Sequence, residues 1–435
     1  MWERCRDEYA TLFSYELFRP DFVVIMQTIF LAALIWAWAL TPESLVFVDK
    51  GGGLSGLAMI AYLGFGCILA MLCSSVIHDR RLKDTGKVSD YEVLLRMYGR
   101  LVSISLVFGG RVPLLLLAST GMLVTAGFAF NEIYLYWFPN FLFASLLLGA
   151  IGLINLFKEK YALFLQLVSA VLVFAALLIL ILHGGGGNGL AGSGTAPAAG
   201  RGFDLSLLVL GFISFLGFDF HRSTGETRVV FFSLVSVFGL LSLWVWLMVG
   251  HVAADTLATV DVAYMFAARS VAGEEGRYVM GAAVIGGVVC GVNGLFIVVR
   301  RCFEDIAREL HGRYGRHHNS VMVGIFVLII EIMMLGGVAG EGVLRLQIRA
   351  SIVLWLCYLL SRVIAGGHLL RQKRCRKGWL GYGLAPLLVL MALVLVFQRG
   401  GWHYLIEFVA VIVAATVLLS FAWMKVAERL KEKRL

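Results

Sequence analysis

Apolar residues form continuous runs of about 20 residues along the chain, separated by short charged or Gly- and Pro-containing segments. The runs lack the alternation of apolar and polar residues that a membrane β-barrel strand shows. A helix of about 20 apolar residues crosses the roughly 30 Å hydrocarbon layer of a bilayer. The pattern therefore predicts an all-α polytopic membrane protein with about twelve transmembrane helices. The runs lie at approximately 22–46, 54–76, 101–130, 136–156, 161–183, 204–220, 229–252, 278–300, 320–338, 344–367, 379–398 and 403–424.

Composition excludes a soluble protein, because 60% of the 435 residues are hydrophobic and 15% are charged, against about 25% charged in soluble domains. The net charge of +9 comes from basic residues that concentrate in every second loop. With a cytoplasmic N-terminus, about three quarters of the 37 basic residues fall on the inner side. This asymmetry predicts a multi-pass protein of the inner (plasma) membrane with both termini cytoplasmic. The lipid bilayer is then the expected partner, nucleic acid is not, and the oligomeric state is open.

A glycine-rich segment, 184–203, separates the fifth and sixth spans and has the composition of a flexible extracytoplasmic linker. It divides the first ten spans into two sets of five, 22–183 and 204–368. Two such sets that enter from opposite sides are the arrangement of inverted repeats, in which the first helix of each set is broken near the bilayer centre. A cytoplasmic segment, 1–21, precedes them, and 369–435 holds helices 11 and 12 and a basic cytoplasmic tail.

The sequence contains no pattern that predicts catalysis. No Ser/His/Asp spacing and no His-Glu-x-x-His motif occurs, and the nine histidines are scattered over both membrane faces. His317 and His318 are adjacent and so point in different directions on a helix, which makes them a poor metal-binding pair. The seven cysteines are odd in number and contain no Cys-x-x-Cys. We therefore expect neither an enzyme nor a cofactor or metal site.

The sixth span carries Gly211 and Gly217, followed at once by Phe218 and Asp219. A helix with these glycines is weakly supported in its middle, and an unwound turn there would present backbone N–H and C=O groups to a bound solute. The alternative is a small-residue packing surface with Asp219 at its inner end.

The stretch from Phe212 to Asp219 resembles the Phe-x-x-Phe-Ile-Gly-Phe-Asp signature at the broken sixth helix of amino acid/polyamine/organocation (APC) transporters. Ile154-Asn155-Leu156 with Gln166 is similar to the start of the family's fifth helix, and Cys290-Gly291-Val292-Asn293 with Ala307-Arg308 is similar to its eighth. The resemblance implies the leucine-transporter-type fold, a 5+5 inverted repeat core plus two peripheral helices. It further implies that solute lies between broken helices 1 and 6, flanked by helices 3 and 8.

The first span departs from the family pattern, because Ile35 to Thr41 replace the Gly-x-Gly-Ile-Phe whose backbone amides hold a substrate carboxylate. Trp36 and Trp38 are either an aromatic wall for a ligand or anchors near the interface. No Ser or Thr occurs in 281–300, where the family's sodium site takes hydroxyl ligands, so sodium coupling is not expected. The candidate substrate-binding residues are Ala37, Trp38, Arg111, Ser214, Phe215, Gly217 and Phe218. The candidate gating or coupling residues are Asp219, Glu226 and Asn293.

Charges inside the apolar runs need partners, since an unpaired one costs about 2.5–3.5 kcal/mol on insertion scales. Arg111 either holds an anionic group of the solute or pairs with a neighbouring helix, and Arg362 also lies within a span. Glu331 and Arg349 lie at comparable depth, so we expect them to pair with each other.

Together these features predict a secondary active transporter of a small organic solute, with an amino acid or amine as the first candidate, that works by alternating access. The alternative is a non-transporting APC-like membrane subunit or solute sensor, which would account for the altered first helix.

Overall fold

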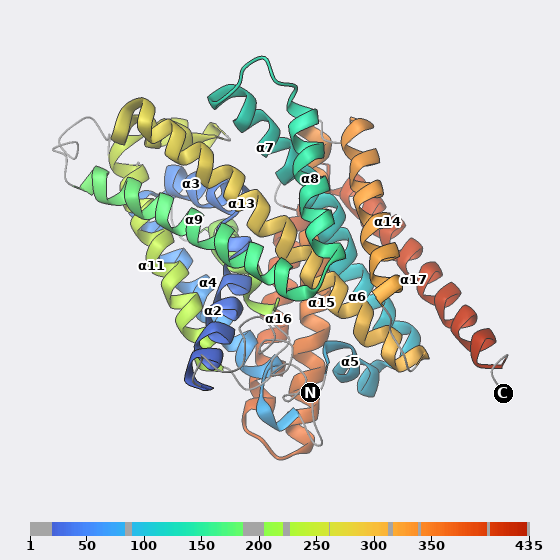
Figure 1. Ribbon diagram of the computed structural model, residues 1–435. Coiled ribbons are helices and arrows are strands. Elements are labelled where there is room, and N and C mark those ends of the chain that lie inside the picture. Colours follow the sequence, from blue (N-terminus) through green and yellow to red (C-terminus); the bar gives the residue numbers. More distant parts are fainter. Residues whose placement is uncertain are drawn as a thin grey trace.

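The computed structural model describes residues 20–82, 89–185, 204–220, 227–260, 262–311, 316–337, 341–397 and 401–432. Every regular element in these ranges is a helix (Figure 1), which confirms the predicted all-α class. The segment 1–19, residues 186–203 of the glycine-rich linker and Glu226 lie outside the described residues. The helices are α2 (Pro20–Ala39), α3 (Pro42–Ser55), η1 (Gly56–Ala58), α4 (Met59–Ile77), η2 (Arg80–Leu82), α5 (Asp90–Tyr98), α6 (Arg100–Pro113), η3 (Leu114–Ala118), α7 (Ser119–Ile133), α8 (Asn140–Leu156), α9 (Glu159–Gly185), α10 (Leu205–Ile213), η5 (Leu216–Asp219), α11 (Thr227–His251), α12 (Ala254–Thr259), α13 (Ala263–His311), α14 (Arg316–Leu335), α15 (Glu341–Gln372), α16 (Lys377–Phe397) and α17 (Trp402–Glu432).

Eight helical segments of the described chain are long and apolar enough to cross a membrane, and three shorter apolar helices accompany them. The protein is therefore a multi-pass membrane protein, and the count of twelve stays a prediction. The eight segments are Pro42–Ile77, Arg100–Ile133, Glu159–Gly185, Thr227–His251, Ala263–Leu310, Leu346–Gln372, Lys377–Phe397 and Trp402–Val426.

Two spans differ from straight helices for identifiable reasons. The third span runs from α6 to α7 through a π-turn, η3, that begins directly after Pro113, the residue in the run that lacks an N–H for the helical ladder. Helix α13 is kinked at Ala272 and Gly273, and Gly273 has a φ of 60° that favours glycine. The predicted eighth span, 278–300, lies wholly in the segment after this kink.

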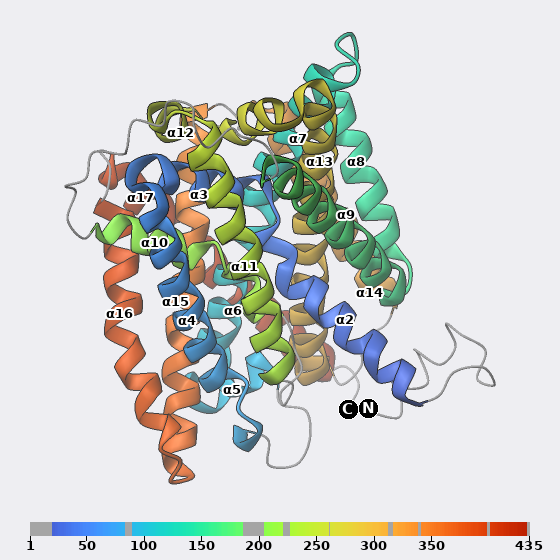
Figure 2. The ribbon, with the colours of Figure 1, turned by 90° about the vertical axis from the view of Figure 1, so that its left-hand side faces the viewer.

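The long helices pack side by side around a buried centre, with α13 along α9, α15 along α16 and α10 against α4 (Figures 1 and 2). Glycines allow the closest approach: a Cβ atom added at Gly211 would lie 2.4 Å from the carbonyl oxygen of Tyr62 on α4. Helices α16 and α17 are the least buried of the eight segments: 28% and 17% of the residues in their most apolar stretches are buried inside the protein. They are therefore peripheral, as the resemblance implies for helices 11 and 12.

Candidate functional site

Two helix interruptions face each other at the centre of the protein. Helix α2 ends at Ala39, and α3 begins at Pro42 after an extended Thr41 whose hydroxyl oxygen accepts from the Ser44 N–H at 3.3 Å. Thr41 also donates to the carbonyl oxygen of Trp38 at 2.7 Å. A Thr N-cap followed by Pro at the first helical position is a favoured helix start, so the local sequence explains this interruption.

The predicted interruption of the sixth span is present. Helix α10 ends at Ile213, Ser214 and Phe215 form a turn, and the short 3₁₀ helix η5 follows. Gly217 packs directly on α2: a Cβ atom added there would lie 2.4 Å from the Ile35 carbonyl oxygen. Gly217 is therefore required by the close approach of the two backbones, and it packs η5 against the end of α2.

The candidate substrate-binding residues cluster at these interruptions. Ala37, Trp38, Ser214, Phe215 and Phe218 are at most 1% exposed, so the centre is filled by side chains in this conformation. The Nε1–H group of Trp38 is buried, and the described part of the chain supplies no hydrogen-bond partner for it. Because buried N–H groups are rarely left unpaired, this donor is available to a ligand acceptor.

The neighbouring Trp36 packs between helices. Its ring stacks on Phe174 at 5.3 Å between centroids, and its Nε1–H donates to the carbonyl oxygen of Ser233 at 3.1 Å. Trp36 therefore fastens α2 to α9 and α11, and Trp38 is the one of the two that lies at the contact between the interruptions.

Arg111 of α6 forms a buried ion pair with Asp219 of η5. Its two Nη atoms lie 3.2 and 2.7 Å from the two carboxylate oxygens, and Nη2 also lies 3.1 Å from the Asp219 carbonyl oxygen. Both side chains are at most 1% exposed. Trp355 of α15 donates to the same carboxylate at 3.3 Å. Of the two interpretations of Arg111, the structure shows the pair with a neighbouring helix.

A second ion pair extends this cluster toward α5. Arg362 of α15 binds Asp90 at 2.5 Å, and its other Nη atom lies 3.6 Å from the Asp219 carboxylate. The hydroxyl of Tyr358 donates to Asp90 at 3.1 Å, and its ring lies under both guanidinium groups. Two arginines therefore balance two aspartates. Such a network is compatible with burial because each charge has an opposite partner.

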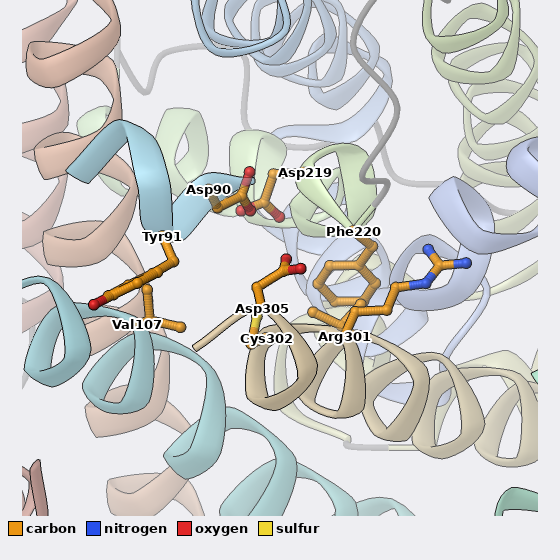
Figure 3. Close-up of a pocket in the computed structure, with 9 residues that line it drawn as sticks. Asp90, Tyr91, Val107, Asp219, Phe220, Arg301, Cys302 and Asp305 are labelled. Atoms are coloured by element: carbon orange, nitrogen blue, oxygen red, sulfur yellow. The ribbon is translucent and has the colours of Figure 1, made fainter. Parts of the chain in front are cut away.

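A small cavity opens beside this network on the side of α5 and the end of α13 (Figure 3). Its volume of about 20 Å³ holds roughly one water molecule. The carboxylates of Asp90, Asp219 and Asp305 and the ring of Phe220 line it. Burial raises the pKa of Tyr91, at its rim, to about 12, so this hydroxyl is protonated at neutral pH.

A buried amide network joins three spans behind the first interruption. Asn293 of α13 donates to Gln166 of α9 at 2.9 Å and accepts from Asn155 of α8 at 2.9 Å. Gln166 in turn donates to the Ala33 carbonyl oxygen of α2 at 3.1 Å. The three residues quoted for the family resemblance thus touch one another, and they hold α2 just before it breaks. The gating role of Asn293 stays a prediction.

The expected pair of Glu331 and Arg349 is absent from the described residues. Glu331 accepts a hydrogen bond from Ser145 at 2.5 Å, and Arg349 donates to the Leu395 carbonyl oxygen at 2.5 Å. We expected the pair because both residues lie at a similar depth along the membrane normal. A charged side chain can instead form hydrogen bonds with any hydroxyl or carbonyl group nearby.

Sequence reasoning missed Asp90, Trp355 and Tyr358 as members of the charged cluster. Asp90 follows the N-cap Ser89, whose hydroxyl oxygen accepts from the Glu92 N–H, so in the sequence it looks like an ordinary first-turn acid. Arg362 inside an apolar run was the one available signal, because it required a partner.

Metal ligands are scarce at this centre. Among the described residues, no group of three or more His, Cys, Asp or Glu side chains is arranged to hold a metal ion. Two arginines occupy the carboxylate of Asp219 at the second interruption. A cation would therefore have to displace an arginine, which carries a permanent positive charge, to reach the Asp219 carboxylate. At the first interruption, Glu43 in the first turn of α3 has a buried oxygen, Oε2, for which the described residues supply no hydrogen-bond partner.

No family model and no curated protein matches the sequence. Solved structures of a manganese transporter from Eremococcus coleocola are similar to it. The complex with an aromatic bis-isothiourea substituted compound is 13% identical, with 94% of this chain and 95% of that chain covered and a TM-score of 0.56. Two mutants of the same transporter are 13% identical over 92% of this chain and 94% of theirs, with TM-scores of 0.58 and 0.57. The likeness shows that the chain has the fold of a membrane transporter.

Proposed function

We propose that the protein is a secondary transporter that carries a small organic solute by alternating access, with an amino acid or an amine as the first candidate. The proposal rests on one observation above all: both spans are interrupted, at Thr41 and at Ser214, and η5 packs through Gly217 on the end of α2. Non-helical backbone in the middle of a membrane protein is tolerated where it is covered by protein or lines a cavity. Paired interruptions of this kind mark solute sites in transporters.

The packed centre represents a closed conformation in this proposal. Ala37, Trp38, Ser214, Phe215 and Phe218 line the site and become accessible when α2 moves away from η5. The unpartnered Trp38 Nε1–H offers a donor to a carboxylate or hydroxyl of the solute. A solute that binds better to one conformation than to the other shifts the equilibrium between them.

Arg111 and Asp219 are proposed to set the charge of the solute. Because the pair is neutral as a whole, a zwitterion or a neutral amine fits beside it without leaving an uncompensated charge. An amino acid carries one group for each member of the pair. The gating assignments of Glu226 and Asn293 remain part of the proposal, Glu226 lying outside the described residues.

The manganese named for the similar structures belongs to that transporter. For this chain, the side chains of the interruptions do not fit a divalent cation. Asp219 is engaged by arginine, and among the described residues no group of three or more His, Cys, Asp or Glu side chains forms around the other carboxylate there, Glu43. Manganese prefers a set of several oxygen or nitrogen ligands, which these residues do not supply. A metal ion is therefore not proposed as the substrate.

A non-transporting membrane subunit or solute sensor is the second candidate. The observation that favours it is the filling of the centre by Trp38, Phe212, Phe215 and Trp355, each under 2% exposed. A receptor that never opens to both sides would show the same closed packing. The two candidates differ in one measurable property, the movement of solute across a bilayer.

Exchange in proteoliposomes tests the proposal. Vesicles with purified protein are preloaded with a mixture of unlabelled amino acids, and uptake of the radiolabelled mixture is followed against protein-free vesicles. A parallel set uses amines. We expect saturable exchange with one set, weakened several-fold by Trp38→Phe, which removes the N–H and keeps an aromatic ring. Trp402→Phe is the matched control, because Trp402 is 49% exposed at the start of α17. Binding that stabilises the protein without exchange would instead favour the sensor.

A further inference from the structure

A pocket of about 360 Å³ lies where the end of α15 meets α5 and η2, apart from the helix interruptions. In Figures 1 and 2, α5 lies beside the lower part of α15. One part of the pocket wall is polar and is formed by Arg96, His368, Gln372 and Lys373. The other part is apolar and is formed by Leu82, Met97 and Leu369. The pocket is thus far larger than the 20 Å³ cavity beside Asp219, and it is amphipathic.

The pocket is positively charged. Among the described residues that line it, Arg96 and Lys373 carry permanent charge and none is acidic. Glu92 binds Arg96 at 2.9 Å at the surface, where both side chains are more than a third exposed, so this pair neutralises little of the field. Further basic residues lie nearby: Arg371 in the last turn of α15, and Arg374 and Arg376 in the connection to α16.

Contacts between sequence-distant residues hold the polar wall in place. Lys373 donates to the Arg81 carbonyl oxygen, and Arg81 lies 2.9 Å from the sulfur of Cys375. His368 lies 3.0 Å from both the Tyr382 hydroxyl and the Gln372 amide. The basic groups are therefore positioned by the fold before any ligand binds, which lowers the entropic cost of binding.

The location of the pocket indicates the chemistry of its ligand. Basic residues gather on the side that the charge asymmetry predicts to be cytoplasmic, where anionic lipids attract them. A basic cavity between membrane helices on that side has the character of a lipid headgroup site. The apolar wall suits the glycerol and the first acyl carbons, and the basic wall suits a phosphate diester. A free inorganic phosphate would use the basic wall alone.

We propose that this pocket binds a phosphate group, carried by the headgroup of an anionic phospholipid. Arg96 of α5 and Lys373, directly after the end of α15, hold the phosphate from two sides. Bound lipid would then join the two helices that also carry Asp90 and Arg362. The site is separate from the solute site, so its test does not depend on transport.

Binding of phosphatidylglycerol to the purified full-length protein in a zwitterionic detergent tests the proposal. Native mass spectrometry counts bound lipid, and thermal unfolding measures stabilisation, with phosphatidylcholine, whose phosphate is balanced by a quaternary ammonium group, as the comparison of zero net charge. We expect phosphatidylglycerol to bind preferentially, and Arg96→Gln and Lys373→Gln each to weaken that binding about tenfold, since each removes a charge-assisted hydrogen bond to the phosphate. The matched control is Arg376→Gln, which removes one exposed charge of the same patch outside the pocket lining and should leave binding within about twofold, because an exposed charge without a direct contact contributes little.

The same measurements give results that would overturn the proposal. Equal weakening by all three substitutions would overturn the proposal of a specific pocket, because it would mean that the basic surface as a whole attracts the lipid. Equal binding of phosphatidylcholine and phosphatidylglycerol would overturn the phosphate-charge chemistry. Inorganic phosphate at matched ionic strength should stabilise the protein less than the lipid does, because it uses the basic wall alone, and a shift equal to that of the lipid would overturn the lipid source. Unchanged size-exclusion elution of each variant shows that it remains folded, so a loss of binding is a local effect.

Discussion

The buried Arg111–Asp219 pair makes the strongest energetic prediction. Arg111→Gln would leave Asp219 with Arg362 at 3.6 Å and the Trp355 N–H. Asp219→Asn would leave two arginines beside each other, with Asp90 as the remaining acid of the cluster. Breaking a buried pair by removing one partner costs about 3–5 kcal/mol. We expect the Asp219 variant at the upper end of this range, because it creates like-charge repulsion.

The double variant Arg111→Gln/Asp219→Asn should cost less than the two single changes combined. It restores charge balance and leaves the Arg362–Asp90 pair at 2.5 Å intact. Its cost reduces to imperfect hydrogen bonding, about 1–3 kcal/mol. The coupling free energy of the cycle is then at least about 2 kcal/mol, whereas independent sites add within about 0.5 kcal/mol.

Unfolding in mixed micelles by sodium dodecyl sulfate, followed by circular dichroism, measures the four proteins of this cycle. The exposed pair Arg269–Glu274, at 3.0 Å with side chains 66% and 56% exposed, supplies a control cycle with coupling below about 1 kcal/mol. Additive losses below about 1 kcal/mol at Arg111 and Asp219 would refute the reasoning, because they would mean that the pair is hydrated or already separated.

Three further predictions concern packing, pH and the amide network. Gly217→Val should reduce the yield of folded protein in size-exclusion chromatography, because its Cβ would lie 2.4 Å from the Ile35 carbonyl oxygen; a normal yield would contradict that contact. Burial alone would raise the pKa of Asp79, but hydrogen bonds from the Arg81 N–H and Lys377 lower it overall. The ionised Asp79 therefore stabilises the folded protein above the ordinary pKa of about 3.9, and this stabilisation is lost as the pH falls through the lowered value. Stability should therefore fall at acid pH less in Asp79→Asn than in the wild type, and parallel pH profiles would contradict this. Asn293→Leu should cost about 1–3 kcal/mol in the same micelle titration by leaving buried amide partners unpaired, and no loss would contradict the network.

The broken sixth helix was predictable because its causes are local. Gly211 and Gly217 weaken the helix within a few residues of the interruption, and the structure breaks it at Ser214 and Phe215. The first helix also breaks where local chemistry favours a new start, at Thr41 and Pro42. The predicted first span, 22–46, runs across that point, because hydropathy registers apolar length and not the cap within it.

The charged cluster was not predictable, because its members are far apart in sequence. Arg111 and Asp219 are 108 residues apart, and Arg362 and Asp90 are 272 apart. The sequence showed that each buried charge required a partner, but only packing selects one. The same limit explains the wrong pairing of Glu331 with Arg349, since depth along the membrane normal says nothing about which helix faces which.

The Ser214→Cys variant tests most directly whether the interruptions open to both sides of the membrane. Ser214 is fully buried, its hydroxyl donates to the Leu210 carbonyl oxygen, and the cysteine is nearly isosteric. The control is Ser420→Cys in α17, equally buried and bonded to the Thr416 carbonyl oxygen. In a background without native cysteines, membrane-impermeant maleimide should label the residue at 214 from either face of oriented vesicles, and the residue at 420 from neither. Labelling at 214 from one face alone, or from none, would contradict alternating access.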